Sequence, residues 1–273
     1  MLGAIIGDIA GSPFEFDRNR ELAHSKKFEL LYPESRFTDD TVMTLAIADA
    51  IVKAIPVKGS HVSEEKFEAQ VIKSMQSFGL KYPNAGYGSR FIYWLMKKNP
   101  RPYNSFGNGS AMRVSPVAWA FNDLESVEKF AEISARVSHN HPEGIKGAQA
   151  TAGAIFLART GHDKAEIKNY VTTCYGYDLS RTLDDIRPSY SHVESCQQTV
   201  PEAITAFLEG NSFEDVTRQA ISLSGDADTL TAIACSIAEG FYGIPDEICD
   251  LFLARLDDYL TDTLLRWELW RTR

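Results

Sequence analysis

The fold of this chain is decided by the stretch TVMTLAIADAIVKAI, residues 41–55. It is long enough for about four helical turns, and its side chains are apolar on nearly every side. Two later stretches, Gly147–Ala158 and Thr229–Ala238, have the same character. Helices that lack a polar face belong in the interior of a large bundle. The sequence therefore predicts an all-α domain with its most apolar helices at the core.

Amphipathic patterns surround these three stretches. Polar residues that suit the start of a helix precede three such patterns, at Ser63, Asp163 and Ser212. Glycines follow the same patterns and are expected to end the helices, at Gly79, Gly176 and Gly225. A fourth pattern runs over residues 248–259. Alternating strand patterns are almost absent, and Phe28–Tyr32 is the only weak candidate for a strand.

Composition narrows the class of protein. The chain has 273 residues, enough for one large domain with a sizeable core, and its net charge is −9. An acidic chain of this kind is not expected to bind nucleic acid through a general basic surface. The cysteines are widely spaced, which argues against a zinc ribbon or a disulfide framework and fits a reducing cytoplasm. They are Cys174, Cys196, Cys235 and Cys249.

Neither a membrane segment nor a targeting segment is predicted. No apolar stretch reaches the roughly 18 residues that a transmembrane helix needs. The apolar start of the chain lacks a basic residue and is interrupted by Asp8, so it does not resemble a signal peptide. The expected location is the cytoplasm, without membrane contact. The oligomeric state is open, and a monomer is favoured.

Two acidic clusters stand directly before central apolar stretches. One is Phe37-Thr38-Asp39-Asp40-Thr41, and the other is Ser224-Gly225-Asp226-Ala227-Asp228-Thr229. Helix capping explains one acceptor per helix, but each cluster offers two carboxylates and additional hydroxyls. Oxygen ligands of this kind suit Mg²⁺, Mn²⁺ or Ca²⁺. We therefore expect the two clusters to meet around a shared cation site, with simple capping as the alternative.

Glycine-containing segments supply candidate ligand contacts. In Ser105-Phe106-Gly107-Asn108-Gly109-Ser110, two glycines around an asparagine permit close backbone approach. Backbone N–H groups near a helix start at Ser110 could cradle a phosphate, although the segment is neither a Walker A loop nor a Rossmann fingerprint. An ordinary turn is the alternative. Gly86-Tyr87-Gly88-Ser89 is a weaker example of the same kind.

Two further polar segments carry open alternatives. Ser138-His139-Asn140-His141-Pro142 either caps a helix that begins at Pro142 or presents His139 or Asn140 to a ligand. Zinc is not favoured there, because no third ligand stands nearby. Glu15 follows Ser-Pro-Phe in an expected loop, where a glutamate is usually a surface or turn residue. Glu15 becomes a candidate site residue only in combination with the other polar segments.

Taken together, these segments resemble the ADP-ribosylglycohydrolase family. The resemblance rests on five motifs in order along the chain: Gly7-Asp8-x-x-Gly11-x-x-x-Glu15, Thr38-Asp39-Asp40-Thr41, Gly107-Asn108-Gly109-Ser110-x-Met112-Arg113, Ser138-His139 and Gly225-Asp226-x-Asp228-Thr229. Each motif alone is weak, but five in this order are specific. The resemblance implies a single domain over residues 1–273, a compact all-α orthogonal bundle of many helices with a two-metal cleft.

The resemblance also assigns roles to residues. Two divalent cations, Mg²⁺ or Mn²⁺, would be held by Thr38, Asp39, Asp40, Asp226, Asp228 and Thr229. Substrate would be bound by Asp8, Gly86, Gly88, Gly107, Asn108, Gly109, Ser110, Met112 and His139. The catalytic carboxylates would come from Glu15, Asp39 and Asp228. Which of these three transfers the proton stays open.

The implied activity is metal-dependent hydrolysis of the bond between ADP-ribose and a modified acceptor. The expected partner is an ADP-ribosylated protein or a small ADP-ribose conjugate. Arginine is the first choice of acceptor, with serine, a nucleic-acid end and O-acetyl-ADP-ribose as alternatives. Two other functions use the same residues. One is a non-catalytic module that binds ADP-ribose, and the other is a phosphohydrolase that splits the diphosphate.

Overall fold

A computed structural model describes residues 1–272, and in this range the backbone forms helices and loops without a strand. The helices, in chain order, are α1 (Leu2–Gly11), the 3₁₀ helix η1 (Ser12–Asp17), α2 (Arg20–Ser25), α3 (Asp39–Ala54), α4 (Glu64–Lys81), α5 (Ser89–Met96), α6 (Gly109–Met112), α7 (Ser115–Ala120), α8 (Leu124–Arg136), α9 (Pro142–Arg159), α10 (Lys164–Tyr175), α11 (Leu183–Ile186), α12 (Cys196–Glu209), α13 (Phe213–Ile221), α14 (Ala227–Tyr242), α15 (Asp246–Leu253) and α16 (Asp258–Arg271). The predicted all-α fold is confirmed.

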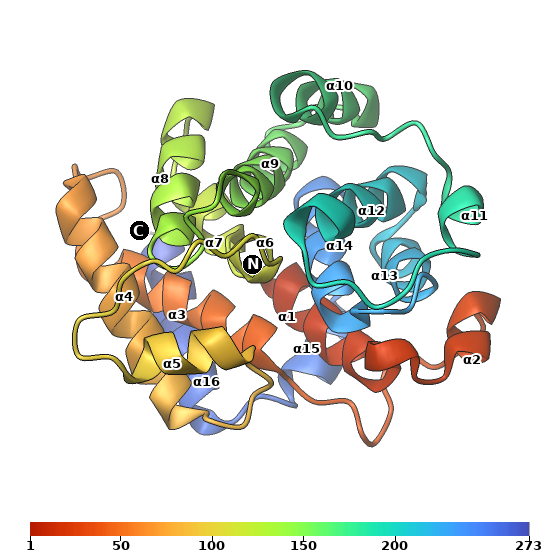
Figure 1. Cartoon of the computed structure of the whole chain (residues 1–273), viewed down its shortest axis with the longest axis horizontal. Coiled ribbons are helices and arrows are strands. Elements are labelled where there is room, and N and C mark those ends of the chain that lie inside the picture. The colour runs from red at the N-terminus through yellow and green to blue at the C-terminus, as the bar shows by residue number, and fades with distance from the viewer. Residues whose placement is uncertain (273) are drawn as a thin grey trace.

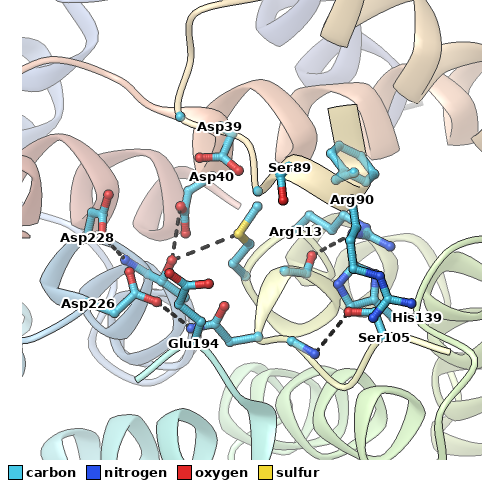
Figure 2. Close-up of a pocket in the computed structure, with 18 of the residues that line it drawn as sticks. Asp39, Asp40, Ser89, Arg90, Ser105, Arg113, His139, Glu194, Asp226 and Asp228 are labelled. Carbon is cyan, nitrogen blue, oxygen red and sulfur yellow. Dashed lines mark hydrogen bonds between the residues drawn. The ribbon is translucent and has the colours of Figure 1, made fainter. Parts of the chain in front are cut away.

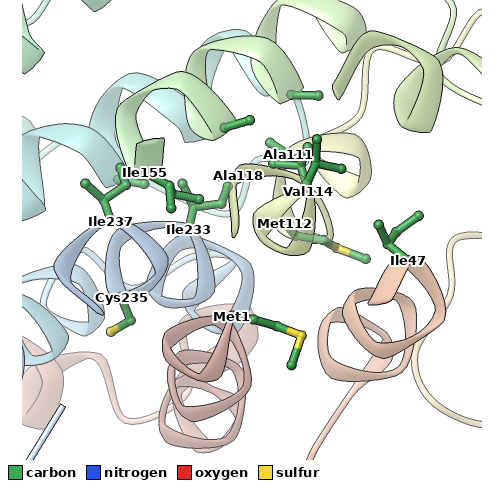
Figure 3. Packing of buried hydrophobic residues seen from close by; sticks show 14 of the residues in the cluster. Met1, Ile47, Ala111, Met112, Val114, Ala118, Ile155, Ile233, Cys235 and Ile237 are labelled. Atoms are coloured by element: carbon green, nitrogen blue, oxygen red, sulfur yellow. The ribbon is translucent and has the colours of Figure 1, made fainter. Parts of the chain in front are cut away.

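The three apolar stretches form α3, α9 and α14, and almost all of their side chains are buried. Figure 1 shows α1 and α9 between a group that contains α3 and α4 and a group that contains α12 and α13. Side chains from α1, α3, α9 and α14 meet the short helices α6 and α7 in one core (Figure 3). Helices that are apolar all round therefore occupy the centre, as their composition requires.

The closest helix pair is α1 with α14, and glycines make the approach possible. Gly3, Gly7 and Gly11 are spaced by four residues and so share one face of α1. A Cβ atom added at Gly7 would lie 2.4 Å from the carbonyl oxygen of Thr231, and one at Gly11 would lie 2.5 Å from the Cα atom of Asp228. The two backbones are therefore in direct contact. This contact brings Asp8 and Asp228 to the same end of the helix pair.

The caps predicted from sequence are confirmed in several places. The side chains of Ser63, Asp163 and Ser212 each accept a backbone hydrogen bond at the start of a helix. Asp163 and Glu166 form a reciprocal capping box, and Gly176 ends α10 with φ of 64°. These are local interactions, so sequence spacing alone was sufficient to locate them.

Three sequence expectations were wrong in detail. Phe28–Tyr32 is a loop, because its aromatic side chains pack around Phe14 rather than along a sheet. Gly79 does not end α4, which continues to Lys81; a Cβ atom there would lie 2.5 Å from the side chain of Leu95, so the glycine makes room for α5. α13 ends at Ile221, and Gly225 belongs to the left-handed turn before α14.

Candidate metal centre and ligand cavity

Both acidic clusters face one cavity of about 270 Å³. The residues predicted for the site that line this cavity are Glu15, Asp39, Asp40, Gly86, Gly88, Gly107, Asn108, Gly109, Met112, His139, Asp226, Asp228 and Thr229. Segments from residue 15 to residue 229 therefore converge, although they are remote in sequence. Figure 2 shows the aspartates on one side of the cavity, with Arg90, Arg113 and His139 on the other.

Three of the predicted residues lie behind the cavity wall. Asp8 accepts hydrogen bonds from the backbone N–H groups of Thr38, at 2.8 Å, and Thr41, at 3.0 Å. The hydroxyl of Thr38 donates to the other oxygen of Asp8, at 2.7 Å. The hydroxyl of Ser110 donates to the carbonyl oxygen of Gly144, at 2.7 Å. Asp8 and Thr38 thus hold the start of α3 in place, and Ser110 anchors the glycine loop to α9.

Capping explains little of what the aspartates do. Thr38 is the N-cap of α3, and its hydroxyl accepts from the backbone N–H of Asp40 at 3.4 Å. Asp226 is the N-cap of α14, yet its side chain makes no cap hydrogen bond. One of its carboxylate oxygens accepts instead from the side-chain amide of Asn108, at 2.6 Å. The carboxylates are therefore available on the cavity side.

The carboxylates form two overlapping groups that could hold metal ions. One group is Asp8, Asp40 and Asp228, and the other is Glu15, Asp226 and Asp228. Within each group, one oxygen from each residue lies within 4.8 Å of the others. Asp228 belongs to both groups, as expected for a ligand between two ions. Asp39 lines the same cavity but belongs to neither group.

The environment of these carboxylates suits a cation. Burial raises the pKa of Asp40 and Asp228 well above the usual range, and neighbouring carboxylates, including Asp8 and Asp226, raise it further. The Oδ1 atom of Asp40 is buried, and no group in residues 1–272 donates a hydrogen bond to it. A buried acceptor without a donor is costly. A divalent cation would satisfy this oxygen and offset the repulsion, so the residues fit the group.

Metal-free protein should therefore become more stable as the pH falls from 7.5 to 5.5. Because the pKa of Asp40 and Asp228 is raised on folding, the folded state binds more protons than the unfolded state at pH values above about 4. We expect the melting temperature in EDTA to be higher at pH 5.5 than at pH 7.5, by about 3 °C. Differential scanning calorimetry measures it. Saturating Mg²⁺ should stabilise the sample at pH 7.5 more than the sample at pH 5.5. A melting temperature in EDTA that rises with pH would contradict the raised pKa of these carboxyl groups.

The segment that carries Glu15 is strained and is bonded to the second acidic cluster. Phe16 and Asp17 both have φ of 58°, in the left-handed region. The backbone N–H of Phe16 donates to the carbonyl oxygen of Gly225 at 2.8 Å, and the N–H of Gly225 donates to Asp17 Oδ1 at 3.0 Å. The half-buried Glu15 is thereby placed beside Asp226, whose charge, after burial, helps to raise the pKa of Glu15.

The Ser138–Pro142 segment caps α9 and also contributes a residue to the cavity wall. His141 is the N-cap of α9, and its Nδ1 atom accepts from the backbone N–H of Glu143 at 3.1 Å. His139 is 5% exposed and lines the cavity. Asn140 does not line it, since its side-chain oxygen accepts from the backbone N–H of Asn104 at 2.8 Å. The capping alternative thus applies to His141, and the ligand alternative stays a prediction for His139 alone.

Sequence reasoning missed several residues of the cavity wall. They are Arg90, Tyr103, Arg113, His192 and Glu194. Arg113 belongs to the motif Gly107-Asn108-Gly109-Ser110-x-Met112-Arg113, but nothing in the sequence indicates that its side chain is buried at the cavity. His192 and Glu194 lie on the long loop before α12, and an isolated β-bridge between Gly107 and Ser195 brings this loop against the glycine segment. No sequence spacing indicates a contact of that kind.

Comparison with known proteins agrees with this geometry. The family model described as ADP-ribosylglycohydrolase matches residues 1–271. The chain belongs to the ADP-ribosylglycohydrolase family. It is therefore an enzyme of the class that cleaves the glycosidic bond of ADP-ribose. Within residues 1–272 this ADP-ribosylglycohydrolase has no helix that is long and apolar enough to cross a bilayer.

Individual relatives are distant but extend over most of the chain. ADP-ribosylhydrolase ARH3 from Homo sapiens is 25% identical in an alignment that is 351 residues long. This alignment covers 99% of this chain and 92% of that protein. ADP-ribosylarginine hydrolase Tri1 from Pseudomonas putida (strain GB-1) is 27% identical over 277 residues, 89% of this chain and 70% of that protein. A solved structure, an ADP-ribosylglycohydrolase-related protein complex, superposes with a TM-score of 0.67 at 22% identity over 99% of this chain and 96% of that one, which shows the shared fold.

Proposed function

We propose that this enzyme releases intact ADP-ribose from ADP-ribosylated arginine side chains of proteins, with two divalent cations, Mg²⁺ or Mn²⁺, as cofactors. One observation carries the proposal. The carboxylates of α3, α14 and the Glu15 segment converge in a cavity that the Gly107–Gly109 loop also lines, with Asn108 bonded to Asp226 and both glycines beside His139. The layout suits a ligand that has hydroxyl groups at one end and phosphates at the other.

The two overlapping carboxylate groups would hold the cations. Asp40 and Asp226 would each serve one ion, Asp228 would serve both, and Thr229 would add a hydroxyl from the cavity wall. Asp39 completes the acidic wall, while Asp8 and Thr38 support α3 from behind. Divalent cations, when bound, orient ribose hydroxyls and supply positive charge next to an attacking water.

The rest of ADP-ribose would extend away from the acidic end. The glycines of the Gly107–Gly109 loop and of the Gly86–Gly88 turn have no side chains and would let the diphosphate approach the backbone, although Gly86 itself lies beside Asp39. A second hollow of about 340 Å³ adjoins the cavity and shares Arg90, Ser105, Gly107 and Glu194 with it.

The acceptor end of the cavity is acidic, which favours a cationic acceptor. Glu15 and Asp226 stand there, and Glu194 is 71% exposed beside His192, with its Oε1 atom 3.0 Å from the Nε2 atom of His192. A carboxylate is the preferred partner of a guanidinium group. The relative Tri1 is named as an ADP-ribosylarginine hydrolase, and this name supports the same acceptor.

Hydrolysis would add water across the bond between the anomeric carbon and the acceptor nitrogen. Water oxygen forms a bond to the carbon, the carbon–nitrogen bond breaks, and one proton from water ends on the nitrogen. The transition state has oxocarbenium character, as in glycoside hydrolysis generally. Glu15 lies beside Asp226 and Asp228 with a raised pKa, so its carboxyl group can hold and pass on this proton.

A substrate panel tests the proposal. Arginine-, serine- and nucleic-acid-linked ADP-ribose and O-acetyl-ADP-ribose are incubated with Mg²⁺, with Mn²⁺ and with EDTA, and the products are separated by chromatography. We expect fastest release of ADP-ribose from the arginine conjugate, and loss of release in EDTA. A Glu194→Gln variant should raise the KM for the arginine conjugate about tenfold and leave O-acetyl-ADP-ribose unaffected.

Other outcomes would identify the rivals. Tight binding of ADP-ribose without release would indicate a binding module. AMP and ribose phosphate as products would indicate a phosphohydrolase. Preference for serine or nucleic-acid conjugates would retain the hydrolase and overturn only the choice of arginine.

A further inference from the structure

His139 is a polar residue of the cavity wall that has no role in the proton transfer proposed above. His139 is 5% exposed, and its ring lies next to the Gly107–Gly109 loop (Figure 2). A Cβ atom added at Gly109 would lie 3.3 Å from its Nε2 atom, and one at Gly107 would lie 3.5 Å away. The two glycines therefore leave open the space in front of Nε2. No hydrogen-bond partner for Nε2 exists within residues 1–272, although the side chain is almost fully buried.

Behind the ring, a chain of buried hydrogen bonds begins at Arg113. Its guanidinium group is 1% exposed and donates to the hydroxyl oxygen of Ser138, at 3.0 Å. It also donates to the carbonyl oxygens of Gly109, at 2.7 Å, and Ser134, at 3.2 Å. The hydroxyl oxygen of Ser138 lies 2.8 Å from Nδ1 of His139. Arg113 thus connects the glycine loop, the end of α8 and the imidazole ring.

The chemistry of these groups determines where the imidazole proton lies. A guanidinium group only donates hydrogen bonds, so the Ser138 oxygen accepts from Arg113. The Ser138 hydroxyl is fully buried, and within residues 1–272 its proton has no acceptor other than Nδ1. If Nδ1 carried the proton of a neutral ring, the hydroxyl proton would be left buried and unpaired, at a considerable cost. Nδ1 therefore accepts, and the ring proton lies on Nε2.

We propose that Arg113 and Ser138 hold His139 in the neutral tautomer with its proton on Nε2, and that this N–H group donates a hydrogen bond to an oxygen atom of the bound ligand between Gly107 and Gly109. The identity of the ligand, ADP-ribose, rests on the proposed function, but the tautomer does not. Burial and the charges of Arg113 and Arg90 lower the pKa of His139 well below its usual range, which agrees with a neutral ring.

This arrangement has a consequence for specificity. A neutral N–H group can bond only to an acceptor, such as a phosphate or ribose oxygen, and it cannot form an ion pair. The positive charge near the loop is carried by Arg113 and Arg90, which also line the cavity, and not by the imidazole ring. Arg113 and Ser138 thus act on the ligand through His139, whose Nε2 atom would touch it.

Nitrogen NMR of the whole enzyme with ¹⁵N-labelled histidine tests the tautomer directly. The chain has six histidines, and the signal missing from a His139→Gln variant assigns the ring. We expect Nδ1 to be unprotonated and Nε2 protonated in the wild type, and ADP-ribose with Mg²⁺ to shift the Nε2 signal. In Ser138→Ala we expect a mixture of tautomers. A protonated Nδ1 in the wild type would overturn the proposal whatever the ligand is.

Paired substitutions of the ring test the donor and do not depend on the Ser138 variant folding. The side-chain amide of glutamine can place an N–H near the position of Nε2, whereas that of asparagine reaches only the position of Nδ1. Calorimetry should therefore show ADP-ribose binding within about threefold of wild type for His139→Gln and about tenfold weaker for His139→Asn. Equal weakening in both would overturn the donor role. If NMR shows Nε2 protonated but the wild type does not bind ADP-ribose, the tautomer held by Arg113 and Ser138 would be supported. The proposed function would then be overturned.

Discussion

Replacing Asp228 with asparagine should reduce the release of ADP-ribose roughly a thousandfold or more, which corresponds to about 4 kcal/mol of lost transition-state stabilisation. Asp228 is the one carboxylate that belongs to both candidate metal groups, and it is 3% exposed. The variant should also lose the stabilisation that Mg²⁺ gives to the wild type. Initial rates with the arginine conjugate and melting temperatures with and without Mg²⁺ measure both effects.

The matched control is Asp258→Asn. Asp258 stands in the first turn of α16, as Asp228 stands in the first turn of α14, but it is exposed and does not line the cavity. An aspartate that only complements a helix dipole contributes about 0.5 kcal/mol. We expect full activity and a full response to Mg²⁺ in this variant. If Asp228→Asn behaved like Asp258→Asn, its carboxylate would be a helix-terminal charge and not a ligand.

Replacing Gly7 with alanine should destabilise the enzyme by about 3 kcal/mol or more, a large effect for one methyl group. The added Cβ atom would lie 2.4 Å from the carbonyl oxygen of Thr231 and 2.7 Å from the Cα atom of Ala232. These are backbone atoms, so no side chain can rotate to relieve the clash. Urea unfolding followed by circular dichroism gives the change in the free energy of unfolding.

A substitution at Leu2 controls for the change in helix composition. Leu2 belongs to the same helix but is only partly buried, so Leu2→Val should cost less than about 1 kcal/mol. Gly7→Ala should in addition weaken Mg²⁺ binding, because moving α1 away from α14 moves Asp8, and with it the start of α3 that carries Asp40, away from Asp228. A Gly7→Ala variant with wild-type stability would show that the two helices are not in backbone contact.

The sequence predicted the core helices and the caps because both depend on local patterns. Residues 41–55 are apolar all round, and Asp163 with Glu166 stands at the spacing of a capping box. The family resemblance supplied the order of the motifs, and the structure places most of their residues around one cavity. Periodicity and short motifs were sufficient for these features.

Other features depend on contacts between distant segments, which no single-sequence pattern reveals. Gly3, Gly7 and Gly11 have the four-residue spacing of a close helix contact, yet the partner helix begins more than two hundred residues later. Asp8 was assigned to substrate, and the structure places it behind α3, where three hydrogen bonds occupy its carboxylate. Glu194 reaches the cavity from a loop whose path is set by tertiary contacts.

The pair of hydrogen bonds between the Glu15 segment and Gly225 connects ligand binding at Glu15 with cation binding at Asp226. A ligand that displaces Glu15 must break these bonds or carry Gly225 with it, and Gly225 is joined directly to Asp226. Cation affinity and ligand affinity then both depend on the hydrogen bonds between the Glu15 segment and Gly225. Thermodynamic reciprocity requires each to change the other by the same factor, so occupancy of the candidate metal centre and the position of the Glu15 segment are expected to be coupled.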